Sequence, residues 1–514
     1  MLAGAAGGAL AIAAPPLLRP GGLLVSSASA SRPRPFAREL PIPRVLADAD
    51  LQIPIVEAEI PILPGPRTRM WTYGGEFPGP TIRRPTGQRT TVTYDHRLPK
   101  EAGELTTHLH GGHNRSDDDG QPGGLTRDHP VSLYCDISRT LSPEQSGNDL
   151  LIHPGTKRRY TYDFVEDGAP ERATMHWYHD HRLDRTGRNN WRGLNGMWIS
   201  DDDLDSSLPL PRGEREIPLM ISDRSFDRDN QLTDPFGGVA RAPYDGIQGR
   251  VVLVNGALLP HHAVRAGRYR LRILNASNFR SYDLEMTGGV TITQIGTDSG
   301  LIPKPLVRSK LLIGPGERLD LVVDFGRAEH RDVELRSVPR PHGPRKVGST
   351  TYRGTLMQFR VGKRVRGDAT SVPAELRPLP DWVGSIPDEV AHEWRITVSS
   401  GFIATWLING RTFDPAYVDH RPQLGTTETW RVVNGTEVAH LFHLHHTDWY
   451  LLSRNGAPPA PYESCLKETF FMDPGDELLL AGRFSDHAGK YVVHCHMIDH
   501  EDHGLMSQFE TVAQ

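Results

Sequence analysis

The sequence predicts an all-β protein built from three similar domains. Its length of 514 residues is sufficient for about three domains of ~150 residues each. The 42 prolines and 51 glycines favour short strands and many turns over long helices. The chain also repeats itself at a spacing near 160 residues, which indicates three copies of one structural unit.

Turn sequences mark this repeat. Pro-Gly steps precede alternating, Val-rich segments at Gly155, Gly316 and Gly475, which are 161 and 159 residues apart (316 − 155 and 475 − 316). The segments 272–275 (RILN) and 431–434 (RVVN) are also 159 residues apart (434 − 275). Apolar and polar residues alternate between the turns, as in the half-buried strands of a β-sandwich or barrel.

The repeat and the composition together predict the domain limits. Two similar Asn-Gly steps, at 255–256 and 409–410, fall in the second and third units. We expect an export signal and N-terminal arm over 1–44, domains over 45–205, 206–365 and 380–514, and a Pro-rich linker over 366–379.

The N-terminus indicates export. Residues 2–25 are rich in Ala, Gly and Leu, and the sequence Ala-Ser-Ala at 28–30 offers a cleavage site. The basic start of a signal is missing, so we expect a secreted or periplasmic protein that uses twin-arginine export, with the beginning of its signal absent. A plain Ala/Gly tail is the alternative. No later stretch is long and apolar enough to span a bilayer.

The charge and the cysteine content limit the possible binding partners and disulfide bonds. The net charge of −5 is spread without a basic stripe, which argues against a nucleic-acid partner. Of the three cysteines, Cys135 and Cys465 would pair in an exported protein or stay as two unrelated thiols. The third, Cys495, belongs to a metal motif.

That motif is His494-Cys495-His496, followed by His500. A thiolate with imidazoles is the donor set of a blue-copper electron-transfer site. On a strand, alternate side chains point to opposite faces. Cys495 would then face one metal site, while His494 and His496 face another.

Three further histidine motifs accompany it. They are His108-x-His110, His179-x-His181 and His440-x-x-His443-x-His445. In each H-x-H pair the two rings point to the same side of a strand, so they can reach adjacent metal ions. All motifs lie in the first and third predicted domains, which must therefore dock. We interpret the second domain as a spacer.

These four motifs, in this order, resemble those of the multicopper oxidases, and the resemblance covers about residues 45–514. It implies three cupredoxin-like Greek-key β-barrel domains and four copper ions per chain. The implied ligands are His440, Cys495 and His500 for type 1 copper; His108 and His443 for type 2; and His110, His179, His496 with His181, His445, His494 for the type 3 pair.

The segments 177–181 (WYHDH) and 500–503 (HEDH) are most similar to the bacterial laccase, bilirubin oxidase and phenoxazinone synthase branch. This resemblance implies a monomer that takes single electrons from phenols or aminophenols at the surface edge of His500. The electrons would pass through the type 1 copper to the trinuclear cluster, where O2 is reduced to water.

Other activities of the same family stay open. A ferroxidase needs carboxylates near the type 1 site, and Glu463 and Glu468 are candidates. A cuprous-ion oxidase is disfavoured by only 10 methionines without a cluster. A copper-free scaffold of the same fold is disfavoured because all eleven donor residues are present.

Two acidic residues match positions that relay protons in the spore-coat laccase branch, namely Asp119 and Glu501. Reduction of O2 consumes protons, and positioned carboxylates can deliver them. The alternatives are a solvated loop charge for Asp119 and a surface ion pair for Glu501.

The axial position of the type 1 copper has two candidates. Leu505 stands ten residues after Cys495, where bacterial relatives often have methionine. Leucine has no donor atom, so we predict a raised reduction potential. A one-residue shift would instead bring Met506 to the copper. Four histidines lie beside the motifs, and we expect supporting or surface roles for them: His113, His176, His446 and His503.

Overall fold

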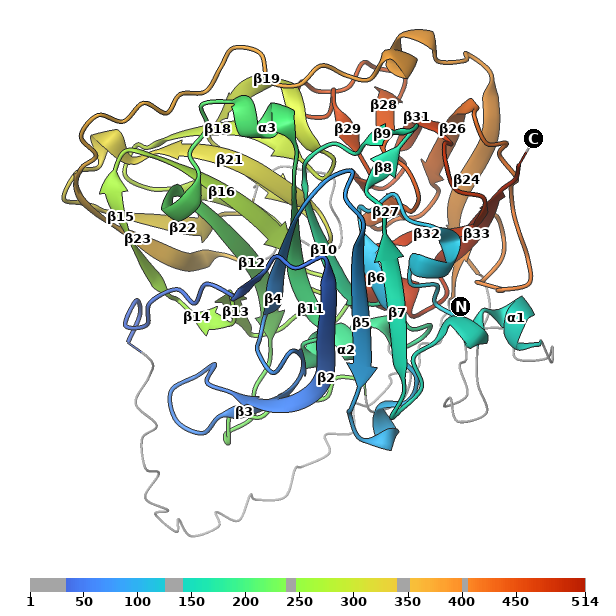
Figure 1. The fold of residues 1–514 in the computed structure, drawn as a ribbon, viewed down its shortest axis with the longest axis horizontal. Coiled ribbons are helices and arrows are strands. Elements are labelled where there is room, and N and C mark those ends of the chain that lie inside the picture. Colours follow the sequence, from blue (N-terminus) through green and yellow to red (C-terminus); the bar gives the residue numbers. More distant parts are fainter. Residues whose placement is uncertain (1–33, 125–141, 237–245, 340–351, 400–404, 514) are drawn as a thin grey trace, which may run out of the picture. The chain divides into compact units, whose positions relative to one another are not determined.

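Residues 34–124, 142–236, 246–339, 352–399 and 405–513 are described by the computed structural model (Figure 1). Among them are strands β1 to β33 and four α-helices of at most 7 residues, which confirms the all-β prediction. No helix in these ranges is long and apolar enough to cross a membrane. Cys135 and the predicted signal up to residue 30 lie outside them, so the pairing and the export remain predictions.

The first pair of sheets uses residues 45–201, with strand orders β3-β2-β5-β7 and β1-β4-β11-β10-β6. The strands are β1 (Val45–Leu46), β2 (Asp50–Ile60), β3 (Thr68–Tyr73), β4 (Gly79–Pro85), β5 (Thr90–His96), β6 (Thr107–His110), β7 (Lys157–Tyr162), β10 (Met175–Asp180) and β11 (Asn195–Asp201). Strand β2 buries every second residue at its start, including Leu51, Ile53 and Ile55. These side chains pack with Trp198 between the two sheets.

The second pair of sheets uses residues 216–364, with strand orders β14-β13-β12-β16-β21-β18-β19 and β15-β23-β22-β17-β20. The strands are β12 (Glu216–Arg224), β13 (Val251–Val254), β14 (Ala257–Leu258), β15 (His261–Ala266), β16 (Arg268–Asn275), β17 (Tyr282–Met286), β18 (Thr291–Thr297), β19 (Gly300–Arg308), β20 (Leu311–Ile313), β21 (Arg318–Asp324), β22 (Asp332–Ser337) and β23 (Gly354–Arg364). Their core includes Leu271, Leu321 and Phe359.

The third pair of sheets uses residues 390–511, with strand orders β25-β24-β26-β31-β28-β29 and β30-β27-β32-β33. The strands are β24 (Val390–Val398), β25 (Trp406–Ile408), β26 (Thr427–Asn434), β27 (His440–Leu444), β28 (Trp449–Arg454), β29 (Leu466–Lys467), β30 (Thr469–Met472), β31 (Glu477–Arg483), β32 (Gly489–Cys495) and β33 (Met506–Thr511). Their core includes Trp394, Trp430 and Phe509.

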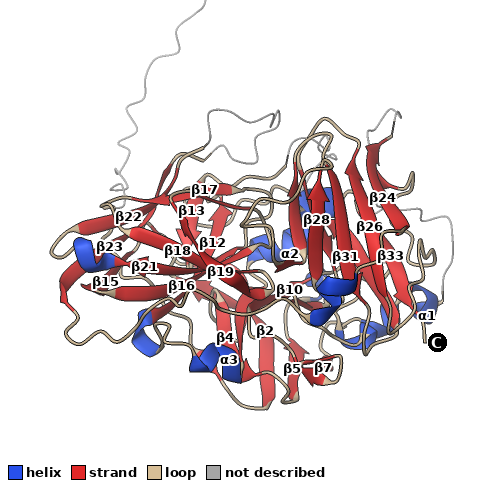
Figure 2. Ribbon diagram, turned by 90° about the horizontal axis from the view of Figure 1, so that it is seen from above, coloured by secondary structure: helices blue, strands red, loops and turns tan. Residues whose placement is uncertain are grey.

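The helices are short and lie at the ends and edges of the strands (Figure 2). They are α1 (Pro143–Ser146), α2 (Thr186–Arg192), α3 (Asp203–Ser207) and α4 (Ile498–Glu501), with the small hairpin β8 (Val165–Glu166) and β9 (Ala169–Pro170). Helix α4 directly follows the Cys495 strand and carries His500.

One strand pairing recurs in all three pairs of sheets. Strands β2 and β5, β12 and β16, and β24 and β26 are parallel neighbours. Parallel neighbours require a crossover rather than a hairpin, as in Greek-key barrels. The predicted cupredoxin-like fold is therefore confirmed, while the exact domain boundaries remain predictions.

The repeated Asn-Gly steps form the same turn. Asn255 and Gly256 have φ values of 48° and 72°, and Asn409 and Gly410 have 50° and 76°. Two successive left-handed residues make the tight hairpin turn that Asn-Gly favours. Asn255 Oδ1 accepts from the N–H of Met220 at 2.7 Å, and Asn409 Oδ1 accepts from that of Arg395 at 2.8 Å. The repeat in sequence is thus a repeat in structure.

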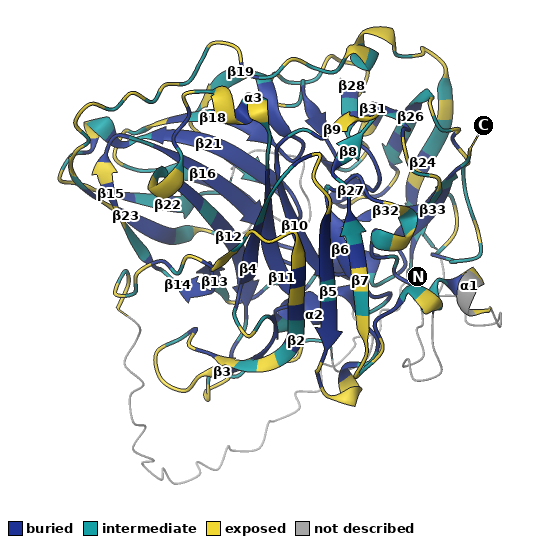
Figure 3. Cartoon of the chain, viewed as in Figure 1, coloured by how far each residue is buried: buried dark blue, intermediate teal, exposed yellow. Residues whose placement is uncertain are grey.

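Strands β6, β10, β27 and β32 are largely buried, and Figure 3 shows them among the dark, buried elements. Every residue of β6, β10 and β27 is buried, as is the C-terminal part of β32. These four strands carry most of the predicted metal ligands.

Candidate metal centre

Strands β6 and β10 position the histidines of the first two motifs. The strands are antiparallel, and His108 lies opposite His179. His108 and His110 share one face of β6 because they are two residues apart. His181 follows the end of β10, and all four rings are buried.

Strands β27 and β32 position the remaining motifs. His443 lies opposite His494, and Phe442 lies opposite Cys495. Adjacent positions on these strands face opposite sides. Cys495 therefore packs into the core with Phe442, while His494 faces the side of His443.

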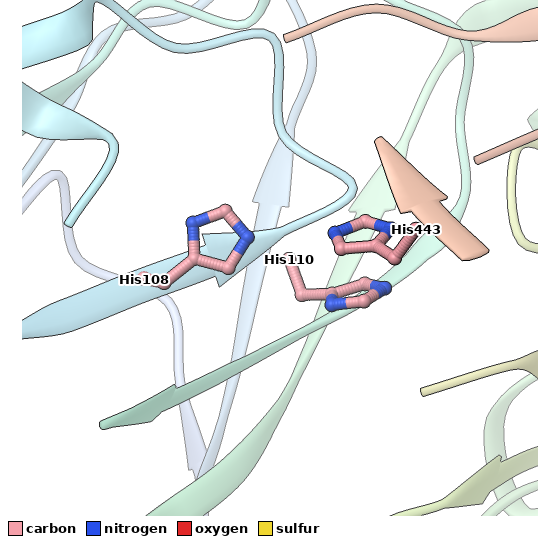
Figure 4. A group of neighbouring side chains, drawn as sticks. All are labelled: His108, His110 and His443. Carbon is pink, nitrogen blue, oxygen red and sulfur yellow. The ribbon is translucent and has the colours of Figure 1, made fainter. Parts of the chain in front are cut away.

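Eight histidines converge where the two strand pairs meet. They are His108, His110, His179, His181, His443, His445, His494 and His496. Their possible ligand atoms form three groups within 4.8 Å: His108, His110, His443; His110, His179, His496; and His181, His445, His494. The last two groups have the membership predicted for the type 3 pair. In the first, the rings of His110 and His443 stack with centroids 3.9 Å apart (Figure 4).

A second group contains the predicted type 1 ligands. The Nδ1 atoms of His440 and His500 are 3.1 Å apart, and each is 3.5 Å from the sulfur of Cys495. All three side chains are buried. The ring of Trp406 packs against both imidazoles, at centroid distances of 4.8 and 4.7 Å.

Hydrogen bonds orient most of the converging rings. His179 donates from Nδ1 to the carbonyl of Asp180 at 2.9 Å, and His443 donates to that of Glu468 at 2.9 Å. His108 donates to the carbonyl of Asp119 at 2.5 Å. Such outer contacts fix the tautomer of a metal-binding imidazole. They leave Nε2 of these rings facing the centre of the group.

Several of the converging nitrogen atoms have no protein partner, whereas Nε2 of His494 lies 3.2 Å from Nε2 of His181 and 3.3 Å from Nε2 of His445. Nε2 of His108, His179 and His443 and both ring nitrogens of His496 form no hydrogen bond. A buried polar atom left unpaired costs about 1–3 kcal/mol. Several buried nitrogen lone pairs that point to one place are therefore suited to binding metal ions. Imidazole together with thiolate suits copper.

Burial also sets the charge state of the donors. It lowers the pKa of His440 to about 3 and that of His181 to about 4, so both rings are neutral at physiological pH and can coordinate. Burial raises the pKa of the Cys495 thiol to about 12. A thiolate at this position therefore needs a cation beside it, which a metal ion would supply.

Both predicted proton-relay residues are buried beside the histidines. Asp119 accepts from Nδ1 of His445 at 2.7 Å. Glu501 is 3.1 Å from Nδ1 of His494 and accepts from the hydroxyl of Thr186 at 2.7 Å. With exposures of 1% and 2%, neither is a solvated loop charge or a surface ion pair.

The four neighbouring histidines stay outside the donor groups found among the described residues. His176 bonds through Nδ1 to the carbonyl of Gly111 at 2.9 Å, and its Nε2 is 3.1 Å from the hydroxyl of Ser200. His113 and His446 are buried and stack on each other, and His503 is partly exposed. The supporting role expected for His176 is what its contacts show.

The two axial candidates lie in different places. Leu505 packs in the same core cluster as Cys495. Met506 packs in another, with Leu183, Phe413 and Val492. The leucine therefore shares the surroundings of the thiol, and the one-residue shift gains no support.

Two expectations from the sequence are wrong. The ring of His500 has no surface edge, because its exposure is 1% and Trp406 and Phe279 pack against it. The second domain is also more than a spacer. It contributes Phe279 here, and Arg318 bonds to Glu468 beside His110.

Sequence reasoning missed this role of Glu468. The residue follows β29 and reaches Nε2 of His110 at 3.0 Å. No motif marks it, because its function depends on strands that meet only in the folded chain.

Comparison with known proteins points to one family. Two domain models described as multicopper oxidase match residues 55–131 and 387–514. A laccase of Bacillus stratosphericus is 30% identical over 484 residues, which cover 87% of this chain and 91% of that protein. A bilirubin oxidase of Albifimbria verrucaria is 29% identical over 460 residues, covering 85% of this chain and 72% of that protein.

Solved structures agree with these relatives. A laccase from Pediococcus acidilactici is 27% identical with a TM-score of 0.75, covering 93% of this chain and 96% of that chain. The McoA multicopper oxidase from Aquifex aeolicus is 26% identical with a TM-score of 0.75, covering 92% of this chain and 99% of that chain.

Proposed function

This chain belongs to the multicopper oxidase family, and we propose that it takes single electrons from phenolic or aminophenolic compounds and reduces O2 to water. Copper-dependent oxidase activity follows from the family. The class of reductant is our proposal, supported by the laccases and the bilirubin oxidase among its relatives.

We assign four copper ions to the converging donors. The assigned ligands are His440, Cys495 and His500 for type 1; His108 and His443 for type 2; and His110, His179, His496 with His181, His445, His494 for type 3. When bound, copper supplies one-electron transfer at the thiolate site and O2 reduction at the histidine cluster. The observation that carries the assignment is the convergence of buried nitrogen atoms without protein partners.

Cys495 joins the two donor groups. Its sulfur lies with His440 and His500, while the neighbouring His494 and His496 belong to the cluster. The covalent path from the sulfur through the adjacent peptide units to the two rings is short. This path is the electron route that we propose between the two groups.

The reductant would approach His500 through aromatic side chains. The ring of Phe279 lies at a centroid distance of 5.2 Å from His500. Apolar aromatic side chains beside His500 suit aromatic reductants. They offer no hydrogen bond that would select one polar substituent of the reductant. We therefore expect broad selectivity among phenols.

Asp119 and Glu501 would hand on the protons that O2 reduction consumes. Each carboxylate bonds to a ring of the cluster and is shielded from solvent. A buried carboxylate in contact with the reacting region can act as a general acid. Asp119 contacts His445 and Glu501 contacts His494, and both histidines belong to the same donor group.

A polar cavity beside the cluster offers a supply of protons. Its lining includes His108 and His445 together with Glu171 and Asp448. Burial raises the pKa of Glu171 to about 8 and that of Asp448 to about 6. Glu171 therefore keeps its proton at neutral pH, whereas Asp448 releases and takes up its proton in mildly acidic solution.

The ferroxidase alternative gains no support from its candidate loop. Glu463 is bonded to Arg454 at 2.5 Å, and Glu468 lies against His110 rather than His500. Neither carboxylate is available to bind an iron ion at the electron-entry side.

Location and assembly remain proposals that rest on the sequence. We propose an exported monomer without a nucleic-acid partner. Size-exclusion chromatography of the mature protein and sequencing of its N-terminus would test both statements.

Copper loading tests the proposed function. We expect close to four copper ions per chain, an intense blue absorption band, and separate type 1 and type 2 signals in electron paramagnetic resonance. Oxidation of aminophenols should exceed oxidation of Fe(II). A folded protein that binds little copper and shows no blue band would contradict the proposal, and faster turnover of Fe(II) would favour the ferroxidase.

A further inference from the structure

A buried ion pair connects the middle domain to the histidine cluster. Arg318 begins β21, Glu468 lies between β29 and β30, and His110 ends β6. Their exposures are 1%, 2% and 0%. Three segments far apart in the sequence thus meet at one imidazole.

His110 is turned the opposite way from its neighbours. Its Nε2 lies 3.0 Å from Oε1 of Glu468 and 3.5 Å from the hydroxyl of Thr469. A carboxylate can only accept, so Nε2–H donates and Nδ1 keeps its lone pair. Nδ1 is the atom without a partner in this ring, whereas in His108, His179 and His443 that atom is Nε2.

Arg318 fixes the position of Glu468. Its Nη2 donates to Oε2 of Glu468 at 3.2 Å, and its Nη1 donates to Oε1. Backbone carbonyls hold the guanidinium from other sides, at 2.7 Å in Met175 and 2.8 Å in Asp298. Met175 starts the strand that carries His179, so the arginine contacts that strand directly and reaches His110 of β6 through Glu468.

Gly111 leaves the space that this arrangement needs. A Cβ atom at Gly111 would lie 2.3 Å from Nη2 of Arg318, and its φ is +80°. Any side chain directly after His110 would therefore collide with Arg318 of the middle domain.

We propose that Arg318 and Glu468 are positioning residues for copper binding, which hold His110 with Nδ1 directed into the cluster. The inference rests on the proposed copper assignment of His110. A carboxylate behind a ligating imidazole fixes its tautomer and orientation. The middle domain thereby takes part in assembling the cluster, although none of the assigned ligands belongs to it.

The test compares copper binding at the two donor groups. Glu468→Gln keeps the size of the side chain but places an amide between His110 and Arg318, and Arg318→Lys keeps the charge but loses the paired contacts. We expect copper affinity of the cluster to fall about 10–100-fold, while the blue type 1 band is retained. Copper per chain and the type 2 and type 3 signals are read without turnover.

A matched control separates positioning from stability. Arg270 is equally buried, belongs to the same domain, and pairs with Asp205 away from every donor group. Arg270→Lys should lower the unfolding temperature without changing the distribution of copper. Glu468→Asp, a milder variant, should lose less cluster copper than Glu468→Gln.

The outcomes separate the positioning role of Arg318 and Glu468 from the copper assignment of His110. Equal loss of copper from both donor groups, or full cluster occupancy with only a lower unfolding temperature, would overturn the positioning role. A wild-type chain that binds no copper would overturn the proposed function, and this inference with it.

Discussion

Two buried polar regions of this protein differ in how their hydrogen bonds are satisfied. In the ion network of the middle domain, Arg270 donates to Asp205 at 2.8 Å and to Asp320 at 2.6 Å, and Arg272 donates to Glu216 at 2.6 Å. In the histidine cluster the rings are as deeply buried, but Nε2 of His108, His179 and His443 has no hydrogen-bond partner.

The difference indicates what each region is for. Buried charges are tolerated when opposite charges and hydrogen bonds surround them, and in the ion network each guanidinium pairs with carboxylates although Nη2 of Arg272 forms no hydrogen bond. Buried ring nitrogens without hydrogen-bond partners lower stability unless a bound metal ion coordinates them. The histidine cluster is therefore a binding site, and the ion network stabilises the contacts between neighbouring strands.

The largest expected effect comes from breaking the network. Arg270→Met leaves Asp205 and Asp320 buried without their shared partner, which should lower the free energy of unfolding by about 3–5 kcal/mol. Denaturant unfolding measures the loss. Copper per folded chain should stay the same, and a loss of cluster copper would mean that the two regions are coupled.

Removal of a proton carrier affects the cluster instead. Asp119→Asn keeps the size of the side chain but cannot exchange a proton, so kcat should fall about 100-fold. Steady-state oxidation of an aminophenol measures the loss, with copper content as the control. An unchanged kcat at full copper loading would remove Asp119 from the proton path.

Low pH should destabilise the ion network by protonating Glu216. Burial would raise the pKa of this carboxyl, but Arg272, Arg270 and Arg83 outweigh burial and lower it to about 2. Its stabilisation is therefore complete above the unfolded pKa of 4.5 and is lost as the pH falls through about 2.

The size of this effect is about 3 kcal/mol, from a pKa difference of roughly 2.5. Unfolding free energies measured between pH 6 and pH 2 should decline less steeply in Glu216→Gln than in the wild type. Parallel curves would show that another group governs acid stability.

The smallest effect concerns the axial position. Leu505→Met brings a thioether into the core cluster that contains Cys495, which should lower the reduction potential of the type 1 copper. Redox titration of the blue band measures the shift. Met506→Leu is the matched control and should leave the potential unchanged, whereas the reverse pattern would assign Met506 to the copper.

Local patterns explain why much of the site could be predicted. Two histidines in an H-x-H step share one face of any strand, and Cys495 faces the other way from His494 for the same reason. The repeated turn at Asn409 is equally local. Each depends only on residues a few positions apart.

The remainder depends on contacts between distant strands. Arg318 and Glu468 are 150 residues apart, and no motif announces their pairing. The burial of His500 depends on Phe279, which belongs to another domain. The interpretation of the middle domain as a spacer failed because it counted ligands and not the residues that hold them.

The most direct test is anomalous diffraction at the copper edge from crystals of the copper-loaded protein. We expect one peak among His440, Cys495 and His500, three peaks enclosed by the eight histidines, and none in the network around Arg270. Peaks on other residues, or an empty histidine cluster in copper-saturated crystals, would contradict the copper assignment.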